Sequence, residues 1–295
     1  MSHPAQPPSF SLKEAQDAEQ VDAALRLLVS KDLAGAERLL TDVVSRAPRD
    51  PRDYVHSYEQ DGSLHIKFWS VEEFAYYATR NQEEFQQRKQ QIVWMKNAYP
   101  RAFFYLGFVR EAQGDHEGAI RWLDEGMKLE PGHPSFRLEL ARAWSGLKQY
   151  ERALALYTEV EEMGEEISAD TRAIALRGKG FQLIEMGHLD HAERCFLDSL
   201  KLEPGNDIAL NELEYIQHLR EGGQKMGSEL TTNGGEKALC CAQCGGDLDG
   251  GSMFNDEGRV ICFCKQCVEA AEEIIRQENA ARTQPPKKKW WQFWS

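Results

Sequence analysis

Residues 101–131 read RAFFYLGFVREAQGDHEGAIRWLDEGMKLEP, and two later segments repeat the same spacing of small and large residues. When Pro100, Pro134 and Ala173 are taken as first positions, position 8 is Gly107, Ala141 and Gly180, position 20 is Ala119, Ala153 and Ala192, and position 24 is Leu123, Tyr157 and Phe196. Small residues at positions 8 and 20 allow paired antiparallel helices to approach closely, and large residues fill the space between them. The second copy starts 34 residues after the first, and five extra residues around EISAD delay the third.

This pattern resembles the tetratricopeptide repeat. A less regular copy begins near Asp17, with small residues at Ala24 and Ala36, and residues 206–220 are typical of a polar capping helix. We therefore expect a mostly α protein, with a tetratricopeptide solenoid over residues 17–222 that follows a disordered N-terminus of residues 1–16.

Residues 51–99 interrupt the period. Apolar and polar residues alternate around Asp61-Gly62, which predicts a β-hairpin. Ser70 and Glu73 form a capping box that predicts the start of a helix through residues 71–99. Ten aromatic residues fall in this insert, and two interpretations stay open. They either form a small core that locks the hairpin against the helices, or they project a surface for a partner protein.

The tetratricopeptide resemblance implies a concave face, lined by the first helix of each repeat, that binds peptides. The candidate residues of this groove are Arg101, Phe104, Phe108, Leu138, Arg142, Arg177 and Phe181. The clamp that binds the C-terminal carboxylate of Hsp70 and Hsp90 chaperones carries an asparagine at position 9, which is absent from every copy here. The mixture of phenylalanine and arginine favours an extended segment with apolar anchors and an acidic group. The insert or the chain's own tail is the alternative occupant.

Six of the seven cysteines lie in residues 240–267. Cys241 and Cys244 form one CxxC pair, Cys264 and Cys267 form another, and the 19 residues between the pairs match a tetrathiolate zinc site. Cys240 and Cys262 are alternative ligands in a shifted register. A closed site of this kind predicts a structural Zn²⁺, and a thiol oxidoreductase that uses the CxxC pairs is the alternative.

The order of a CxxC knuckle, a β-hairpin around Glu257-Gly258 and a helix that carries the second pair resembles a treble-clef zinc finger. The segment VICFCKQCVEAAEEIIRQE is similar to the zinc-binding N-terminal module of the ClpX unfoldase. The resemblance implies homodimerisation or docking of a partner through residues 238–280, after a flexible linker of residues 223–237. The chain contains no GxxxxGK[ST] loop, so it lacks the ATPase that follows this module in ClpX.

The other cysteine and two nearby histidines are not expected to bind a metal ion. Cys195 occupies position 23 of the third repeat, where a core residue is expected. His188 and His191 fall at the turn between paired helices, and we expect them on the surface.

Charge and hydropathy restrict the function further. The net charge is −13, and residues 236–284 contain five basic and nine acidic residues, so the balance argues against nucleic-acid binding by the finger. A nucleic-acid-associated regulator remains an alternative function. The first residues show no signal-peptide pattern, and no run of about 18 apolar residues occurs. We expect a cytoplasmic protein.

The last segment, residues 281–295, is basic and aromatic. Three lysines precede Trp290, Trp291, Phe293 and Trp294, and such an apolar cluster on an acidic chain requires an explanation. It predicts a motif that docks on another protein or in the chain's own groove, or a weak contact with a membrane surface. No catalytic constellation is recognisable, so the sequence as a whole predicts a non-enzymatic protein–protein interaction scaffold or adaptor with structural Zn²⁺.

Overall fold

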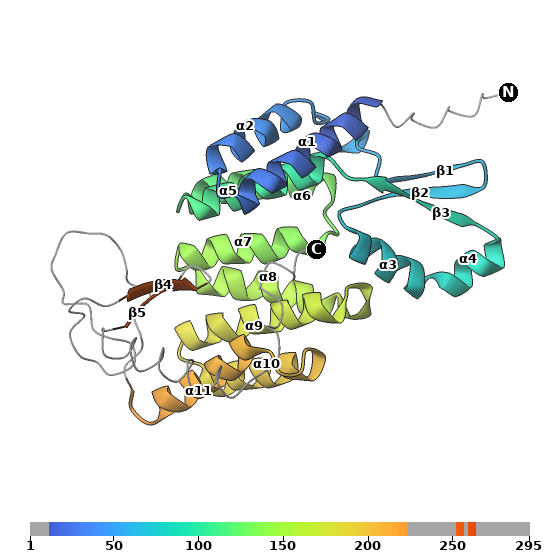
Figure 1. Cartoon of the computed structure of the whole chain (residues 1–295). Helices are drawn as coiled ribbons and strands as arrows, with labels where there is room; N and C mark the ends of the chain where they lie inside the picture. Colours follow the sequence, from blue (N-terminus) through green and yellow to red (C-terminus); the bar gives the residue numbers. More distant parts are fainter. Residues whose placement is uncertain (1–11, 224–251, 257–258, 264–295) are drawn as a thin grey trace, which may run out of the picture. The chain divides into compact units, whose positions relative to one another are not determined.

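The computed structural model describes residues 12–223, 252–256 and 259–263. The chain divides into two compact units, residues 1–222 and residues 223–295. The first unit is a stack of helical hairpins with one inserted sheet (Figure 1). Within the described part of the chain, no helix combines the length and the apolar character needed to cross a membrane.

The helical hairpins follow one another along the chain, and each contacts the next. Their helices are α1 (Leu12–Val29), α2 (Leu33–Val44), α5 (Tyr99–Ala112), α6 (His116–Leu129), α7 (Pro134–Gly146), α8 (Tyr150–Glu162), α9 (Ala169–Glu185) and α10 (Leu189–Leu202), and the single helix α11 (Asp207–Arg220) follows the last hairpin. The first helices α5, α7 and α9 also contact one another, which is the arrangement expected on the concave side of a solenoid. The N-terminal helix α1 begins at Leu12, five residues before the predicted start of the solenoid at residue 17.

The small residues of the repeat lie where the paired helices cross. A Cβ atom added to Gly107 would lie 2.6 Å from Cγ of Leu123, and one added to Gly180 would lie 2.6 Å from the ring of Phe196. Both distances are shorter than real side chains tolerate, so a larger residue would force the helices apart. Positions 8 and 24 of the repeat therefore meet as the sequence predicts.

Each turn between paired helices contains one residue with a left-handed backbone. These residues are Lys31 (φ 63°), Gly114 (φ 76°), Lys148 (φ 59°) and Gly187 (φ 81°). A glycine adopts this conformation without steric cost, whereas a lysine does not. The turn geometry is therefore common to all four hairpins, although only two of them have the residue that suits it.

The insert after α2 contains a sheet and two short helices. Its elements are the 3₁₀ turn η1 (Pro51–Asp53), β1 (Ser57–Gln60), β2 (Ser63–Phe68), α3 (Val71–Arg80), α4 (Gln82–Arg88) and β3 (Gln91–Lys96). The strands β1 and β2 pair antiparallel, with Asp61 (φ 51°) and Gly62 (φ 76°) in the turn between them. The predicted hairpin is confirmed.

The long helix predicted over residues 71–99 is wrong. Two short helices are followed by β3, which pairs parallel with β2, so the sheet has the order β1-β2-β3. Lys89 ends α4 with a left-handed backbone (φ 51°), and the following residues Ile92, Val93 and Trp94 are of the types that favour strands. The predicted capping contact is present at Ser70, whose Oγ accepts from the N–H of Glu73. The Glu73 carboxylate instead accepts from the N–H of Trp69, one residue before the expected partner.

In the second unit the described residues form two strands, β4 (Ser252–Asp256) and β5 (Arg259–Phe263). They pair antiparallel, with Ser252 opposite Phe263 and Asp256 opposite Arg259. This pairing confirms the hairpin predicted around Glu257-Gly258. The proposed zinc ligands and the aromatic tail lie outside the described residues.

Candidate protein-interaction surface

Two of the predicted groove arginines are buried and have partners within the protein. Arg101 is 5% exposed, and its guanidinium donates to Asp22 at 2.7 Å and to the carbonyl oxygen of Asn97 at 3.1 Å. Arg177 is 9% exposed and donates to Glu203 at 2.6 Å. A partner's carboxylate would have to displace these internal acceptors, so both arginines are better explained as structural residues.

The insert covers the first helix of the first regular repeat. The indole of Trp69 contacts the predicted groove residue Phe104, with ring centroids 5.2 Å apart. The same indole stacks on His133 at 3.8 Å and meets Phe136 edge-on at 5.3 Å. Phe104 therefore contributes to an internal aromatic cluster, and the insert occupies part of the face that the sequence assigned to a ligand.

A buried carboxylate fixes this arrangement. Glu130, which follows α6, is 7% exposed, and it accepts hydrogen bonds from Tyr54, Trp69 and Asn97 at 2.7, 2.7 and 2.5 Å. His56 Nδ1 lies 3.0 Å from the same carboxylate. Burial alone would raise the pKa of Glu130, but the hydrogen bond from His56 and the neighbouring charges outweigh burial and lower this pKa. Residues from both ends of the insert thus meet on one ionised side chain of the solenoid.

A second contact joins the insert to the connection between α8 and α9. The hydroxyl of Tyr76, on α3, lies 2.7 Å from the carbonyl oxygen of Glu165 and 2.9 Å from that of Ile167. Glu165 belongs to the 3₁₀ turn η2 (Gly164–Glu166). The five extra residues that delay the third repeat therefore contribute a docking point for α3. No sequence pattern indicates this contact, because the acceptors are backbone atoms.

The remaining groove candidates lie on α5, α7 and α9. Phe108, Leu138 and Phe181 are half-buried, whereas the side chain of Arg142 is 56% exposed. A guanidinium nitrogen of Arg142 lies 3.7 Å from Glu139. Glu139 is itself buried, and burial raises its pKa.

Ile174 adds an apolar residue that the sequence analysis missed. It is 46% exposed, and it occupies position 2 of its repeat, the same position as the candidate Arg101. Its position in the repeat is therefore the sequence feature that identifies Ile174 as a groove residue. Ile174 precedes Phe181 by two helical turns, so both lie on one side of α9.

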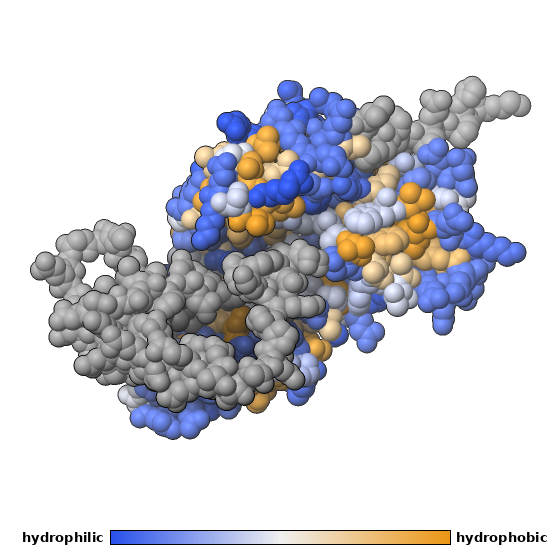
Figure 2. Space-filling model, viewed as in Figure 1, coloured by the Kyte–Doolittle hydropathy of each residue, from blue (hydrophilic) through white to orange (hydrophobic). Residues whose placement is uncertain are grey.

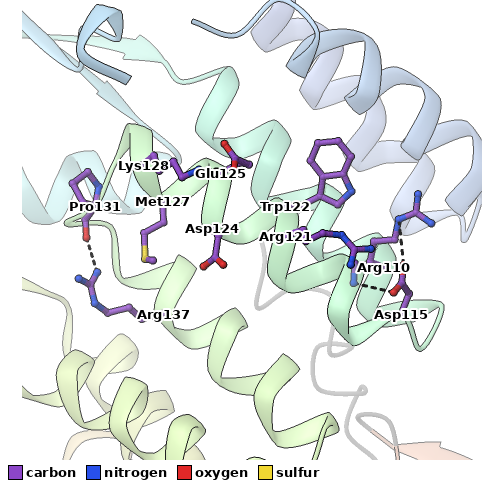
Figure 3. A pocket seen from close by; sticks show the side chains of 11 residues that line it. Arg110, Asp115, Arg121, Trp122, Asp124, Glu125, Met127, Lys128, Pro131 and Arg137 are labelled. Atoms are coloured by element: carbon purple, nitrogen blue, oxygen red, sulfur yellow. Dashed lines mark hydrogen bonds and ion pairs between the residues drawn. The ribbon is translucent and has the colours of Figure 1, made fainter. Parts of the chain in front are cut away.

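A wide cleft of roughly 1040 Å³ lies elsewhere, on α6 and the start of α7 (Figure 3). Its lining includes Arg110, Trp122, Met127 and Arg137 and none of the predicted groove residues. Arg110 pairs with Glu37, and Arg137 pairs with Glu159 at 2.9 Å. Because these charges are paired within the protein, the cleft offers little to fix the orientation of a small ligand.

Of the candidate metal ligands within the first unit, Cys195 is buried and the two histidines are exposed. Cys195 is 8% exposed and belongs to the core around α10, where burial raises the pKa of its thiol to about 11. His188 and His191 are exposed. Among the described residues, no cluster of three or more histidine, cysteine or acidic side chains is arranged to hold a metal ion.

Comparison with known proteins supports the repeat assignment. Residues 111–180 match the tetratricopeptide repeat family, a span that runs from the end of α5 into α9. No match is found among the curated proteins. The repeat phase and the stacked hairpins agree with the family match over this part of the chain.

Solved structures give weaker likenesses. The second tetratricopeptide domain of human RPAP3, in complex with the HSP70 peptide SGPTIEEVD, is 24% identical, with a TM-score of 0.35, and the match covers 40% of this chain and 98% of that one. The first such domain of Spaghetti (RPAP3), bound to the HSP90 peptide SRMEEVD, is 23% identical, with a TM-score of 0.38 and coverage of 41% and 93%. MamA from Desulfovibrio magneticus RS-1 is 15% identical, with a TM-score of 0.45 and coverage of 70% and 86%. With these scores they add nothing to the family match.

Proposed function

We propose that this protein is a non-enzymatic adaptor that binds an extended segment of a partner protein along the first helices α7 and α9. The observation that carries the proposal is the surface formed by Leu138, Arg142, Ile174 and Phe181. These residues lie on successive first helices that contact each other, beyond the point where Trp69 covers the preceding repeat. The insert thereby limits the binding face to the C-terminal part of the solenoid.

The chemistry of this surface favours one class of ligand. Ile174 and the half-buried Leu138 and Phe181 offer contacts for apolar side chains, because burying such surface on association is favourable. The exposed guanidinium of Arg142 is suited to a carboxylate, with which arginine forms two parallel hydrogen bonds. We therefore expect an extended segment with apolar anchors and an acidic group.

Affinity capture with the full chain tests this proposal. Ile174→Glu places a charge on the proposed surface, whereas Leu197→Glu places one on the second helix α10 at a residue of nearly equal exposure, 46% against 45%. The proposal predicts that partners retained by the parent are lost with Ile174→Glu and kept with Leu197→Glu. Equal retention by both variants would contradict it.

We also propose that Cys241, Cys244, Cys264 and Cys267 bind one structural Zn²⁺. The pairing of β4 and β5 supports this, because β5 ends at Phe263, immediately before the second CxxC pair. Four thiolates form a closed site, so the metal would brace the fold without activating a substrate. Elemental analysis of the purified chain should give one zinc per chain. Titration with a thiol reagent should find no reactive CxxC thiols. Free thiol pairs without zinc would favour the oxidoreductase alternative.

The aromatic tail is proposed as a second docking element, with Trp290, Trp291, Phe293 and Trp294 as its anchors. The support is compositional, because four large aromatic residues in the last six positions are unfavourable in water unless they are covered. Deletion of residues 285–295 from the full chain should remove a subset of captured partners. A captured set that does not change would remove the tail from the proposal.

A further inference from the structure

The strand β3 forms an edge of the sheet in the insert, because the strand order is β1-β2-β3. The N–H of Asn97 donates to the carbonyl oxygen of Phe68 in β2 at 3.3 Å. Backbone direction alternates along a strand, so Val93 and Met95 share this orientation, and Ile92 and Trp94 direct their N–H and C=O groups away from β2. Within the described residues, β2 is the only strand that pairs with β3.

The one charged residue of this edge is Lys96, at the end of β3, and it pairs with Glu19 and Asp22. Residues 91–95 contain neither a charge nor a proline, and Trp94 is 39% exposed. The opposite edge, β1, is shorter and carries Glu59, which accepts a hydrogen bond from Gln90. Natural proteins protect edges with charges, prolines or short strands. Figure 2 shows apolar residues gathered over the insert.

A shallow cleft adjoins the same strand. It has a volume of about 390 Å³ and lies between the helices of the insert and the start of β3, with Ala78, Phe85 and Ile92 among its lining residues. Ile92 and Trp94 are two residues apart, so their side chains lie on one face of the sheet. The strand thus presents an exposed indole and, two residues away along the chain, a cleft with room for such a ring. Beside these three apolar residues the cleft is lined by Gln82, Gln86, Lys89, Gln90 and Gln91.

We propose that a second copy of this chain occupies this edge, through antiparallel pairing of β3 with β3 about a two-fold axis at Val93. In this register Ile92 of each copy lies opposite Trp94 of the other. The two residues of such a pair exchange two N–H···O=C hydrogen bonds, so the two pairs form about four hydrogen bonds between the copies. The indole of each copy then lies beside the cleft of the other, since cross-strand side chains on one face are neighbours. Lys96 lies opposite Gln90, so no like charges meet in this register.

The alternative registers are less favourable. A shift that places Trp94 opposite itself brings Lys96 opposite Ile92, and the opposite shift leaves Trp94 facing Gln90. Only the register centred on Val93 places Ile92 opposite Trp94, and the two-fold axis repeats this pair. A two-fold interface requires this kind of self-complementarity, which is why a second copy fits better than an unrelated extended segment.

The mass of the full chain in solution tests the proposal. Light scattering should give twice the chain mass of 33.7 kDa for the parent and for the control variant Gln60→Lys on the opposite edge. Trp94→Lys should give the single-chain mass, with an unchanged far-ultraviolet circular dichroism spectrum. A monomeric parent would overturn the proposal, and so would a Trp94→Lys dimer, which would place the interface elsewhere.

A cysteine at the axis tests the register independently. In the proposed pair the Cα atoms at position 93 lie about 4.5 Å apart, which is within disulfide range. Mild oxidation should therefore link Val93→Cys chains to each other through position 93, as identified by mass spectrometry. Val71→Cys, on the exposed surface of α3, should not link in this way and controls for the native cysteines. Absence of the linkage at position 93 would refute the register and the two-fold pairing.

Discussion

Replacing Glu130 with glutamine removes the carboxylate that joins the insert to the solenoid. Oε1 of Glu130 accepts from Tyr54 and Asn97 and lies 3.0 Å from His56, and Oε2 accepts from Trp69 at 2.7 Å. Glutamine has only one acceptor oxygen. If that oxygen keeps the contacts of Oε1, the amide nitrogen faces the indole N–H, and two donors meet.

The expected cost follows from this geometry. Losing one hydrogen bond to a buried charged acceptor destabilises a protein by roughly 1.5–3 kcal/mol. The contacts that remain become weaker because the acceptor is no longer charged, so we expect Glu130→Gln to lower the free energy of unfolding by roughly 2–4 kcal/mol. Urea denaturation followed by circular dichroism measures this change in the full chain.

A control on α6, the helix that Glu130 follows, distinguishes this effect from a general loss of charge. Glu125 is exposed and pairs with Lys128 at the surface, so Glu125→Gln should change the stability by less than about 1 kcal/mol. Limited proteolysis should cut residues 51–98 faster in Glu130→Gln than in the control. If both variants unfold at the same urea concentration, the insert is not attached through Glu130.

The contribution of Glu130 to the free energy of unfolding depends on pH with a defined sign. The folded pKa of Glu130 is lowered from the ordinary value of 4.5, so its ionised form stabilises the fold fully above about pH 4.5. This contribution is lost as the pH falls through the folded pKa. The stability difference between the parent and Glu130→Gln should therefore be constant near neutral pH and shrink in acid. A difference that grows in acid would contradict the assignment.

Three further predictions concern the solenoid. Gly178→Ala should destabilise the fold by roughly 1–3 kcal/mol in urea denaturation, because its Cβ would meet the ring of Tyr157, whereas Gly132→Ala, in open space, should change little. Lys31→Gly should raise the free energy of unfolding by about 0.5–1 kcal/mol, because Lys31 has a left-handed backbone, and a loss of stability would contradict that conformation. Cys195 should resist alkylation at pH 8 in the folded chain and react only on unfolding, as peptide mapping would show, because burial raises its pKa to about 11.

The sequence predicts the repeat well because its determinants are local. Gly107 with Leu123 and Gly180 with Phe196 meet within single hairpins, where 16 residues separate the partners. The β1–β2 hairpin is also local, and Asp61-Gly62 specifies its turn. Each of these contacts follows from a short spacing that is visible along the chain.

The errors concern contacts between distant residues. Residues 82–88 do form a helix, so the helical pattern was correct there, but pairing with β2 decides the structure of residues 91–96. Arg101 has the exposure expected of a core residue because Asp22, far earlier in the chain, neutralises it. Glu130 resembled an ordinary repeat ending, and its role depends on residues as far away as Tyr54.

The proposed adaptor function requires that α7 and α9 present the binding face for a partner segment. A photo-crosslinking amino acid at position 174 of the full chain tests it most directly, with the same group at position 197 as the matched control. We expect position 174 to crosslink to one contiguous partner segment with apolar and acidic residues, and position 197 not to crosslink to it. Equal crosslinking at the two positions, or crosslinking at position 197 alone, would contradict it.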